Sequence, residues 1–337
     1  ISNQWFSENT DASALPGRSH FDCCVDSIVD WCDQASKVLP ATVDVNETGR
    51  ATSVACKALK ARVLLYAASP LWNGSFPYSN WQNKDYETPG YGKELVSHTY
   101  KPEKWTRALE ACKDALSAAL AEGQRKLFDV TTSEQIRTQE KVDLPTIAGA
   151  SDEFKQHVIQ MRYLATTNES EGNSELIFGA YYPTMDQYDM KLPHAITKLT
   201  STGALIGRWS GYSPTLYTVE QFNTKNGYLP AQDPNFTSES DWFKSAGISG
   251  RADVINLCAN REPRFYAWIG YDGGEYSGKL ANGKPLVVDM KNGTTMQGYN
   301  PTLYPRDNSA TGFLGKKCIW PNLILQSSNN GFANMKF

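Results

Sequence analysis

Apolar residues in the first half of the chain recur every three or four positions, the spacing that places them on one face of an α-helix. The pattern covers residues 19–39, 49–68, 102–123 and 152–164, and it predicts a helix in each segment. In the second and third segments, alanines lie beside the larger apolar residues, and small side chains let two helices approach closely. We therefore expect segments 49–68 and 102–123 to form an antiparallel helical pair of the tetratricopeptide type.

The third predicted helix has the most regular apolar stripe. Its members are Trp105, Leu109, Cys112, Leu116 and Leu120. On the second helix, the corresponding stripe consists of Val54, Ala58, Ala61 and Leu65. Because an apolar stripe on a helix usually faces the core, we expect both stripes to be buried, Trp105 included.

The pattern changes beyond the fourth predicted helix. Residues 175–182, with the sequence ELIFGAYY, predict a buried strand. From residue 183 onward, glycine, asparagine and proline are frequent, so only short elements are expected. These are a helix at residues 215–223 and strands at residues 264–271 and 284–290.

Together these segments predict a mostly α fold: tetratricopeptide-like helical pairs with long irregular loops and a few short strands. We expect a helical scaffold over residues 1–180 and a loop-rich region over residues 181–337, both part of one unit. The scaffold carries a long loop at residues 70–100, in which tryptophan and tyrosine are frequent. Loops of this length are usually functional or disordered, and the density of aromatic residues argues against disorder.

Composition and charge exclude several classes of protein. The 337 residues carry a net charge of −3 with mixed signs, so they offer no basic surface for nucleic acid. The apolar runs are too short for a transmembrane helix. The 7 cysteines are odd in number and lack CxxC spacing, which argues against a disulfide framework and a zinc site. Aromatic residues make up 12% of the chain, and many occur in turn-rich segments where core packing does not explain them.

The sequence contains no motif for catalysis or cofactor binding. It has no HExxH zinc motif, no GxSxG nucleophile elbow and no P-loop, and its 4 histidines are scattered. Alternating polar residues at 233–241 resemble a calcium loop, but Ser238 and Lys244 occupy positions that require glycine and glutamate. We therefore predict a binding protein without catalytic residues, metal site or cofactor. A surface glycosidase that uses two carboxylates is an alternative.

The second predicted helix resembles a known family. Residues 49–74, which begin with GRAT and continue with KALKARVLLYAASPLWNG, resemble a helix and turn of the SusD/RagB family. Further phrases similar to this family follow the same order: FD, IVD and LP at residues 21–40, KW and AL at 104–109, NSELIF at 173–178, PT and VEQF at 214–222, and REPRFY at 261–266. The shared order argues against coincidence.

Members of this family are nutrient-binding lipoproteins on the surface of the Bacteroidetes outer membrane. The resemblance implies that this protein captures an oligosaccharide or polysaccharide and delivers it to a TonB-dependent, SusC-like transporter. Two features depart from the family, because the chain has no lipidation motif and no further helical repeats precede residue 337. We expect a chain that lacks both ends of the protein, with a lipid anchor outside it as the only contact with the membrane. Alternatives are a peptide or glycopeptide binder on the same scaffold and a protein-interaction scaffold without a small ligand.

Aromatic residues in loops are the best candidates for ligand contact. Sugar rings have apolar C–H faces bordered by hydroxyl groups, so they suit flat aromatic side chains with polar neighbours. The resemblance favours the loops between residues 175 and 214, where the candidates are Tyr182, Asp186, Tyr188, Arg208, Trp209 and Tyr212. A second candidate cluster, in the loop at residues 70–100, consists of Trp72, Tyr78 and Trp81. The other interpretation is that these rings cover helix ends or face the transporter.

Overall fold

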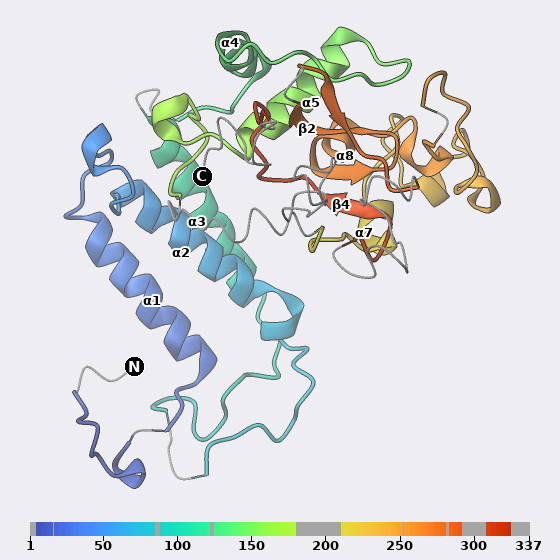
Figure 1. The fold of residues 1–337 in the computed structure, drawn as a ribbon. Helices are drawn as coiled ribbons and strands as arrows, with labels where there is room; N and C mark the ends of the chain where they lie inside the picture. Colours follow the sequence, from blue (N-terminus) through green and yellow to red (C-terminus); the bar gives the residue numbers. More distant parts are fainter. Residues whose placement is uncertain are drawn as a thin grey trace. The chain divides into compact units, whose positions relative to one another are not determined.

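The chain folds into two compact units (Figure 1). The computed structural model describes residues 5–15, 17–84, 88–121, 125–179, 210–251, 253–280, 283–291 and 308–324. Unit 1 comprises residues 1–127 and 174–181, and unit 2 comprises residues 128–173 and 182–337. The predicted class, mostly α with a few short strands, is confirmed. Each unit has its own core, and the two are described in turn.

Unit 1 is built on three long helices that lie side by side: α1 Phe21–Ser36, α2 Ser53–Ala68 and α3 Glu103–Leu120 (Figure 1). Lys57, near the start of α2, pairs with Asp114 in the second half of α3 (2.9 Å), so these two helices are antiparallel. Lys104 in the first turn of α3 pairs with Asp22 in the first turn of α1 (2.6 Å). Helix α1 is therefore antiparallel to α2. Short 3-10 helices are η1 Ala12–Ala14, η2 Val45–Glu47 and η3 Pro70–Trp72.

The core of unit 1 corrects the prediction of which helix faces are buried. On α3, the buried residues are Ala108, Ala111, Ala115 and Ala119. Trp105 is 41% exposed, and Leu109, Leu116 and Leu120 are also exposed. On α2, Val54 and Ala61 of the predicted stripe are buried as expected, but Leu65 is exposed and Leu64 is buried instead. The physical reason is that alanine faces let α2 and α3 approach closely, so the bulkier side chains lie on the outer faces.

Helix α1 begins at a buried histidine. His20 is fully buried, and its Nδ1 accepts a hydrogen bond from the backbone N–H of Asp22 (3.0 Å). The imidazole ring stacks on Tyr91, with 4.0 Å between the ring centroids. Its Nε2 has no hydrogen-bond partner within the described ranges. Burial lowers the pKa of His20, and the acceptor role of Nδ1 requires the neutral ring.

We expect His20 to make the protein less stable in mild acid. Because its pKa is lower in the folded state, the unfolded chain takes up a proton first as the pH falls below about 6.5. The free energy of unfolding should therefore decrease between about pH 7 and pH 5. In His20→Asn, the side chain can still cap the helix but does not titrate, so the decrease should be shallower. Urea unfolding across this pH range measures the difference, and parallel curves for the two proteins would contradict this role of His20.

Unit 2 combines short helices with two small sheets. Its helices are α4 Val130–Gln139, α5 Asp152–Leu164, α7 Leu216–Glu220 and α8 Pro263–Trp268, with 3-10 helices η5 Glu169–Glu171, η6 Pro230–Gln232, η7 Glu239–Asp241 and η8 Asn256–Cys258. Strand β1 Ile269–Tyr271 pairs antiparallel with β4 Phe313–Gly315, and β2 Glu275–Lys279 pairs antiparallel with β3 Pro285–Val287. The largest core cluster gathers around Leu257, Phe265 and Tyr271. Among the described residues, no helix is both long and apolar enough to cross a membrane.

Three segments differ from the sequence prediction. Residues 175–179 form no strand, and Phe178 is 58% exposed. In the strand predicted at residues 264–271, residues 264–268 belong to α8, because Pro263 occupies the first turn and presets a helical backbone. Residues 269–271 form β1 as predicted. Helix α4 was not predicted, since it has little apolar periodicity. It begins where the Asp129 side chain accepts a hydrogen bond from the backbone N–H of Thr132 (2.9 Å).

A buried arginine ties together the core of unit 2. Arg261 is fully buried, and its guanidinium donates to the backbone carbonyls of Val219 (2.7 Å), Phe222 (2.6 Å) and Leu257 (2.6 Å). The guanidinium carbon also lies 4.6 Å from the centroid of the Phe265 ring. Burial lowers the pKa of Arg261 to about 10, so the group stays charged at neutral pH. It joins the end of α7 to the turn before α8.

Candidate functional site

Aromatic rings of the loop after α2 stack on one another and on a ring at the start of α1, and we call this array the aromatic ladder. It consists of Phe21, Trp72, Phe76 and Trp81, with Tyr78 at its edge. The ring centroids are 4.3 Å apart for Phe21–Trp72, 5.7 Å for Trp72–Phe76 and 5.1 Å for Phe76–Trp81, with interplanar angles of 11°, 24° and 23°. Tyr78 meets Phe76 edge-on at 5.6 Å. Three rings that are distant in sequence from Phe21 thus continue a stack that starts on α1.

The exposure of the rings increases toward the outer end of the ladder. Trp72 and Phe76 are half-buried, whereas Trp81 is 39% and Tyr78 is 65% exposed. The exposed neighbours Asn80 and Gln82 flank Trp81 in the sequence. A flat apolar face with amide groups beside it can hold the C–H face of a sugar ring and bind its hydroxyl groups.

Buried hydrogen bonds fix the base of this loop. The Asn73 side chain, 2% exposed, donates to the carbonyl of Lys101 (3.0 Å) and accepts from the N–H of Lys101 (2.8 Å). Gly74 has a φ of +99°, and a Cβ there would lie 3.0–3.1 Å from the backbone of Tyr100. The Lys104 ammonium, which pairs with Asp22, also donates to the carbonyl of Trp72 (3.0 Å). Both ends of the long loop are therefore anchored to the helices, which limits the movement of the inner rings.

The sequence predicted three members of this site, and the structure brings them together. Trp72, Tyr78 and Trp81 all contact Phe76. Phe76 and Phe21 were not predicted as site residues. Phe76 shares the loop with the predicted rings, so the aromatic density of the loop was the available signal. Phe21 starts a helix and resembles an ordinary core residue, so only the tertiary structure reveals its position in the stack.

The other predicted cluster is described at one position only. Tyr182, Asp186, Tyr188, Arg208 and Trp209 lie outside the described residues. Tyr212 belongs to unit 2, is 46% exposed, and its carbonyl accepts a hydrogen bond from the N–H of Gly315 (2.8 Å). A role of this cluster in ligand binding stays a prediction.

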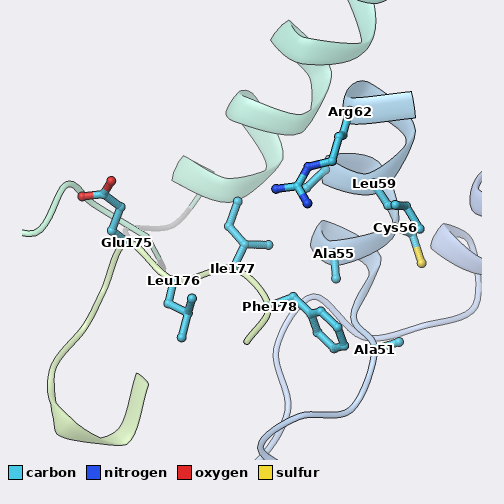
Figure 2. A pocket seen from close by; sticks show the side chains of 10 residues that line it. Ala51, Ala55, Cys56, Leu59, Arg62, Glu175, Leu176, Ile177 and Phe178 are labelled. Atoms are coloured by element: carbon cyan, nitrogen blue, oxygen red, sulfur yellow. The ribbon is translucent and has the colours of Figure 1, made fainter. Parts of the chain in front are cut away.

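Unit 1 also contains an apolar groove of about 600 Å³ between α2 and residues 175–178 (Figure 2). One side consists of Ala51, Ala55, Cys56, Ala58, Leu59 and Arg62. On the other side, Ile177 and Phe178 point toward α2, and the Glu175 carboxylate points away from it. Because most of the lining is apolar, the groove suits an apolar stretch of polypeptide better than a sugar with many hydroxyl groups.

The acidic residues that resemble a calcium loop take part in a turn. Asp233 accepts hydrogen bonds from the side chains of Thr224 (2.5 Å) and Asn226 (2.9 Å) and from the backbone N–H of Asn235 (2.9 Å). The hydrogen bond from Thr224 is the main cause of the lowered pKa of Asp233. Within the described ranges, no group of three or more His, Cys, Asp or Glu side chains could hold a metal ion.

Comparison with known proteins places the chain in a family. The SusD family model matches residues 159–337. The solved structure of BT4246 is 49% identical, with a TM-score of 0.90, and the match covers 99% of this chain and 55% of that one. Its selenomethionine form gives 48% identity and a TM-score of 0.87, over 98% of this chain and 56% of that one.

A SusD-like protein (BF3747) from Bacteroides fragilis NCTC 9343 shares the fold at 19% identity. Its TM-score is 0.58, and the match covers 96% of this chain and 47% of that one. The chain thus spans about half the length of the solved structures that it matches. No curated protein matches it. The family match covers more than half of the residues, and the chain therefore belongs to the SusD family.

Proposed function

We propose that this protein binds an oligosaccharide or polysaccharide at the cell surface and delivers it to a TonB-dependent, SusC-like transporter of the outer membrane. Membership of the SusD family supports nutrient binding as the general function. The observation that carries the proposal is the aromatic ladder, because its outer rings are exposed while buried hydrogen bonds hold the base of its loop. The proposed function requires no catalysis, and we propose that a lipid anchor holds the protein to the outer membrane.

The ladder suits a ligand that must be released. Each aromatic contact with a sugar should contribute about 0.5–1.5 kcal/mol. Two or three such contacts with a few hydrogen bonds give dissociation constants of roughly micromolar to millimolar. Such affinity is sufficient to capture a polymer with many repeated units, and it permits transfer to a transporter.

Trp81→Ala should weaken glycan binding about tenfold, because it removes the outer stacking ring. Isothermal titration and affinity electrophoresis against a glycan panel measure the effect. Trp105→Ala is the matched control, since Trp105 is similarly exposed (41% against 39%) but lies on α3 outside the ladder. Equal binding by the Trp81→Ala and control proteins would remove the ladder from the site.

Trp209→Ala belongs in the same series, because it tests the cluster that the sequence favoured. A loss of binding in this variant alone would place the glycan on the loops between residues 175 and 214. Losses in both variants would assign the ligand to both clusters.

The apolar groove favours a second function. Its lining of alanine and leucine side chains on α2 and its facing ring of Phe178 are suited to another polypeptide. This supports the alternatives of a peptide binder or a protein-interaction scaffold. A wild-type protein that binds no glycan of the panel but binds peptides or copurifies with the transporter would favour them.

A further inference from the structure

Unit 2 contains an open cavity of about 550 Å³ that the proposed glycan surface does not use. Its wall is formed by the turn at residues 146–149, the hairpin at 246–254, residues 258–260 and the turn at 271–274, with Tyr266 of α8. The volume lies within the range of small-molecule sites in proteins, about 300–1,000 Å³. Because these segments are far apart in the sequence, the cavity depends on the tertiary fold.

Hydrogen bonds connect three of these segments around the cavity. Glu275 accepts from the backbone N–H of Thr146 (3.1 Å) with one carboxylate oxygen and from the Arg251 guanidinium (3.2 Å) with the other. Arg251 also donates to the carbonyl of Gly273 (2.8 Å). The turn at 146–149, the hairpin and the turn at 271–274 are thus held in place without a ligand. A site arranged in this way loses little conformational entropy when a ligand binds.

One tyrosine of the wall is nearly buried, and its hydroxyl group has no protein partner among the described residues. Tyr271 is 8% exposed, and its ring stacks on Phe265 with 5.4 Å between centroids. In the described part of the chain, its hydroxyl makes no hydrogen bond. By contrast, the hydroxyl of Tyr266 accepts from the backbone N–H of Arg261 (3.2 Å). Burial holds the pKa of Tyr271 well above its ordinary value, so the group is a neutral donor and acceptor.

Two glycines place this hydroxyl at the cavity. A Cβ on Gly274 would lie 2.7 Å from Cζ of Tyr271, so the hydroxyl-bearing end of the ring rests directly on the glycine backbone. Gly273 has a φ of +75°, and a Cβ there would lie 2.8 Å from Val254. Side chains at these positions would displace Tyr271 or the hairpin. A hydroxyl group that lines the cavity and has no protein partner among the described residues is free to donate to, and accept from, a ligand hydroxyl.

The charges and side chains of the wall define the ligand. Arg251 is the one charged residue among those that line the cavity, and Glu275 neutralises it. Thr146, Ser249 and Asn260 supply hydroxyl and amide groups, while Tyr266 and Tyr271 supply an aromatic wall. We propose that this cavity is a second ligand site, which takes one or two rings of an uncharged sugar and pairs a ligand hydroxyl with Tyr271. The choice of a sugar rests on the proposed function, whereas the site itself rests on the cavity.

Tyr271→Phe tests the proposal, because it removes the hydroxyl and leaves the ring. Saturation-transfer NMR on the full-length protein, with glucose, galactose, N-acetylglucosamine, lactose and maltose as probes, should show binding about tenfold weaker than in the wild type. The unfolding temperature should be unchanged or higher, since no protein hydrogen bond is lost. Tyr217→Phe is the matched control, because Tyr217 lies on α7 and is 71% exposed. It should bind as the wild type does.

A second variant tests the cavity itself, so that the result does not depend on the Tyr271 hydroxyl alone. Ala148 is an exposed lining residue of the turn at 146–149, and Ala148→Trp should fill the cavity and abolish binding of the same probes. Wild-type binding that neither variant changes, or no binding of any probe, would overturn the inference. Trp81→Ala separates the two proposals, because it alters the ladder and leaves the cavity intact. If Trp81→Ala still binds the probes and Tyr271→Phe does not, the cavity is the site of binding, even if the ladder binds no glycan.

Discussion

Arg261→Met is expected to lower the free energy of unfolding by about 3–5 kcal/mol, the largest effect that we predict for a single substitution. The side chain is fully buried, and three backbone carbonyls receive its short hydrogen bonds. Methionine fills a similar volume but removes the donors to the Phe222 and Leu257 carbonyls, whereas the Val219 carbonyl keeps the backbone N–H of Phe222 (3.3 Å). The loss should be large because an unsatisfied buried polar group costs more than a hydrogen bond contributes.

Chemical denaturation followed by circular dichroism measures the change. Arg264→Met is the matched control, since the Arg264 side chain is 48% exposed and its partner Glu262 (2.9 Å) also accepts from the backbone N–H of Asn223 (2.8 Å). Exposed ion pairs contribute about 0–1 kcal/mol, so this variant should remain close to the wild type. Similar losses for both variants would mean that the buried carbonyl contacts do not stabilise unit 2.

Asn73→Ala is expected to lower the free energy of unfolding by about 2–4 kcal/mol and to weaken glycan binding as well. The buried amide satisfies both the N–H and the carbonyl of Lys101, and it closes the long loop between α2 and α3. Without it, the backbone groups at the loop base lose their partners, and Trp72 loses the support of its neighbour. Stability and binding should therefore decrease together.

The control for this variant is Asn80→Ala, because Asn80 is exposed in the same loop. Its unfolding free energy should stay within about 0.5 kcal/mol of the wild type. Thermal unfolding and titration with the glycan panel give both quantities. If Asn73→Ala were destabilised but bound glycan with full affinity, the idea that the loop base positions the ladder for binding would be contradicted.

The positions of the long helices could be predicted because their signal is local. Helix α5 was predicted with its bounds, Asp152–Leu164, and α2 and α3 begin and end within a few residues of the predicted segments. Apolar spacing, a proline in the first turn and capping residues act within one or two turns of the chain. The buried faces were less predictable, because Trp105 and Ala108 are both compatible with a core and only the distance between packed helices decides between them.

The candidate site was predictable only in part. The sequence identified Trp72, Tyr78 and Trp81 from the density of aromatic residues in one loop. It did not reveal the stack on Phe21, because that contact joins the start of α1 to Trp72 of η3, which follows α2. The same limit applies to the cavity of unit 2, where Thr146, Arg251 and Glu275 have no shared motif.

The sequence by itself determined the helical class, the order of the long helices, the family resemblance and the loop that carries the exposed rings. Each of these follows from the spacing and type of neighbouring residues. The tertiary structure alone decided which helix faces are buried, that Phe21 supports the ladder, and that the Tyr271 hydroxyl lines a cavity of unit 2 without a protein partner among the described residues. These features depend on residues distant in the sequence, whose mutual distances are set by side-chain packing rather than by local patterns.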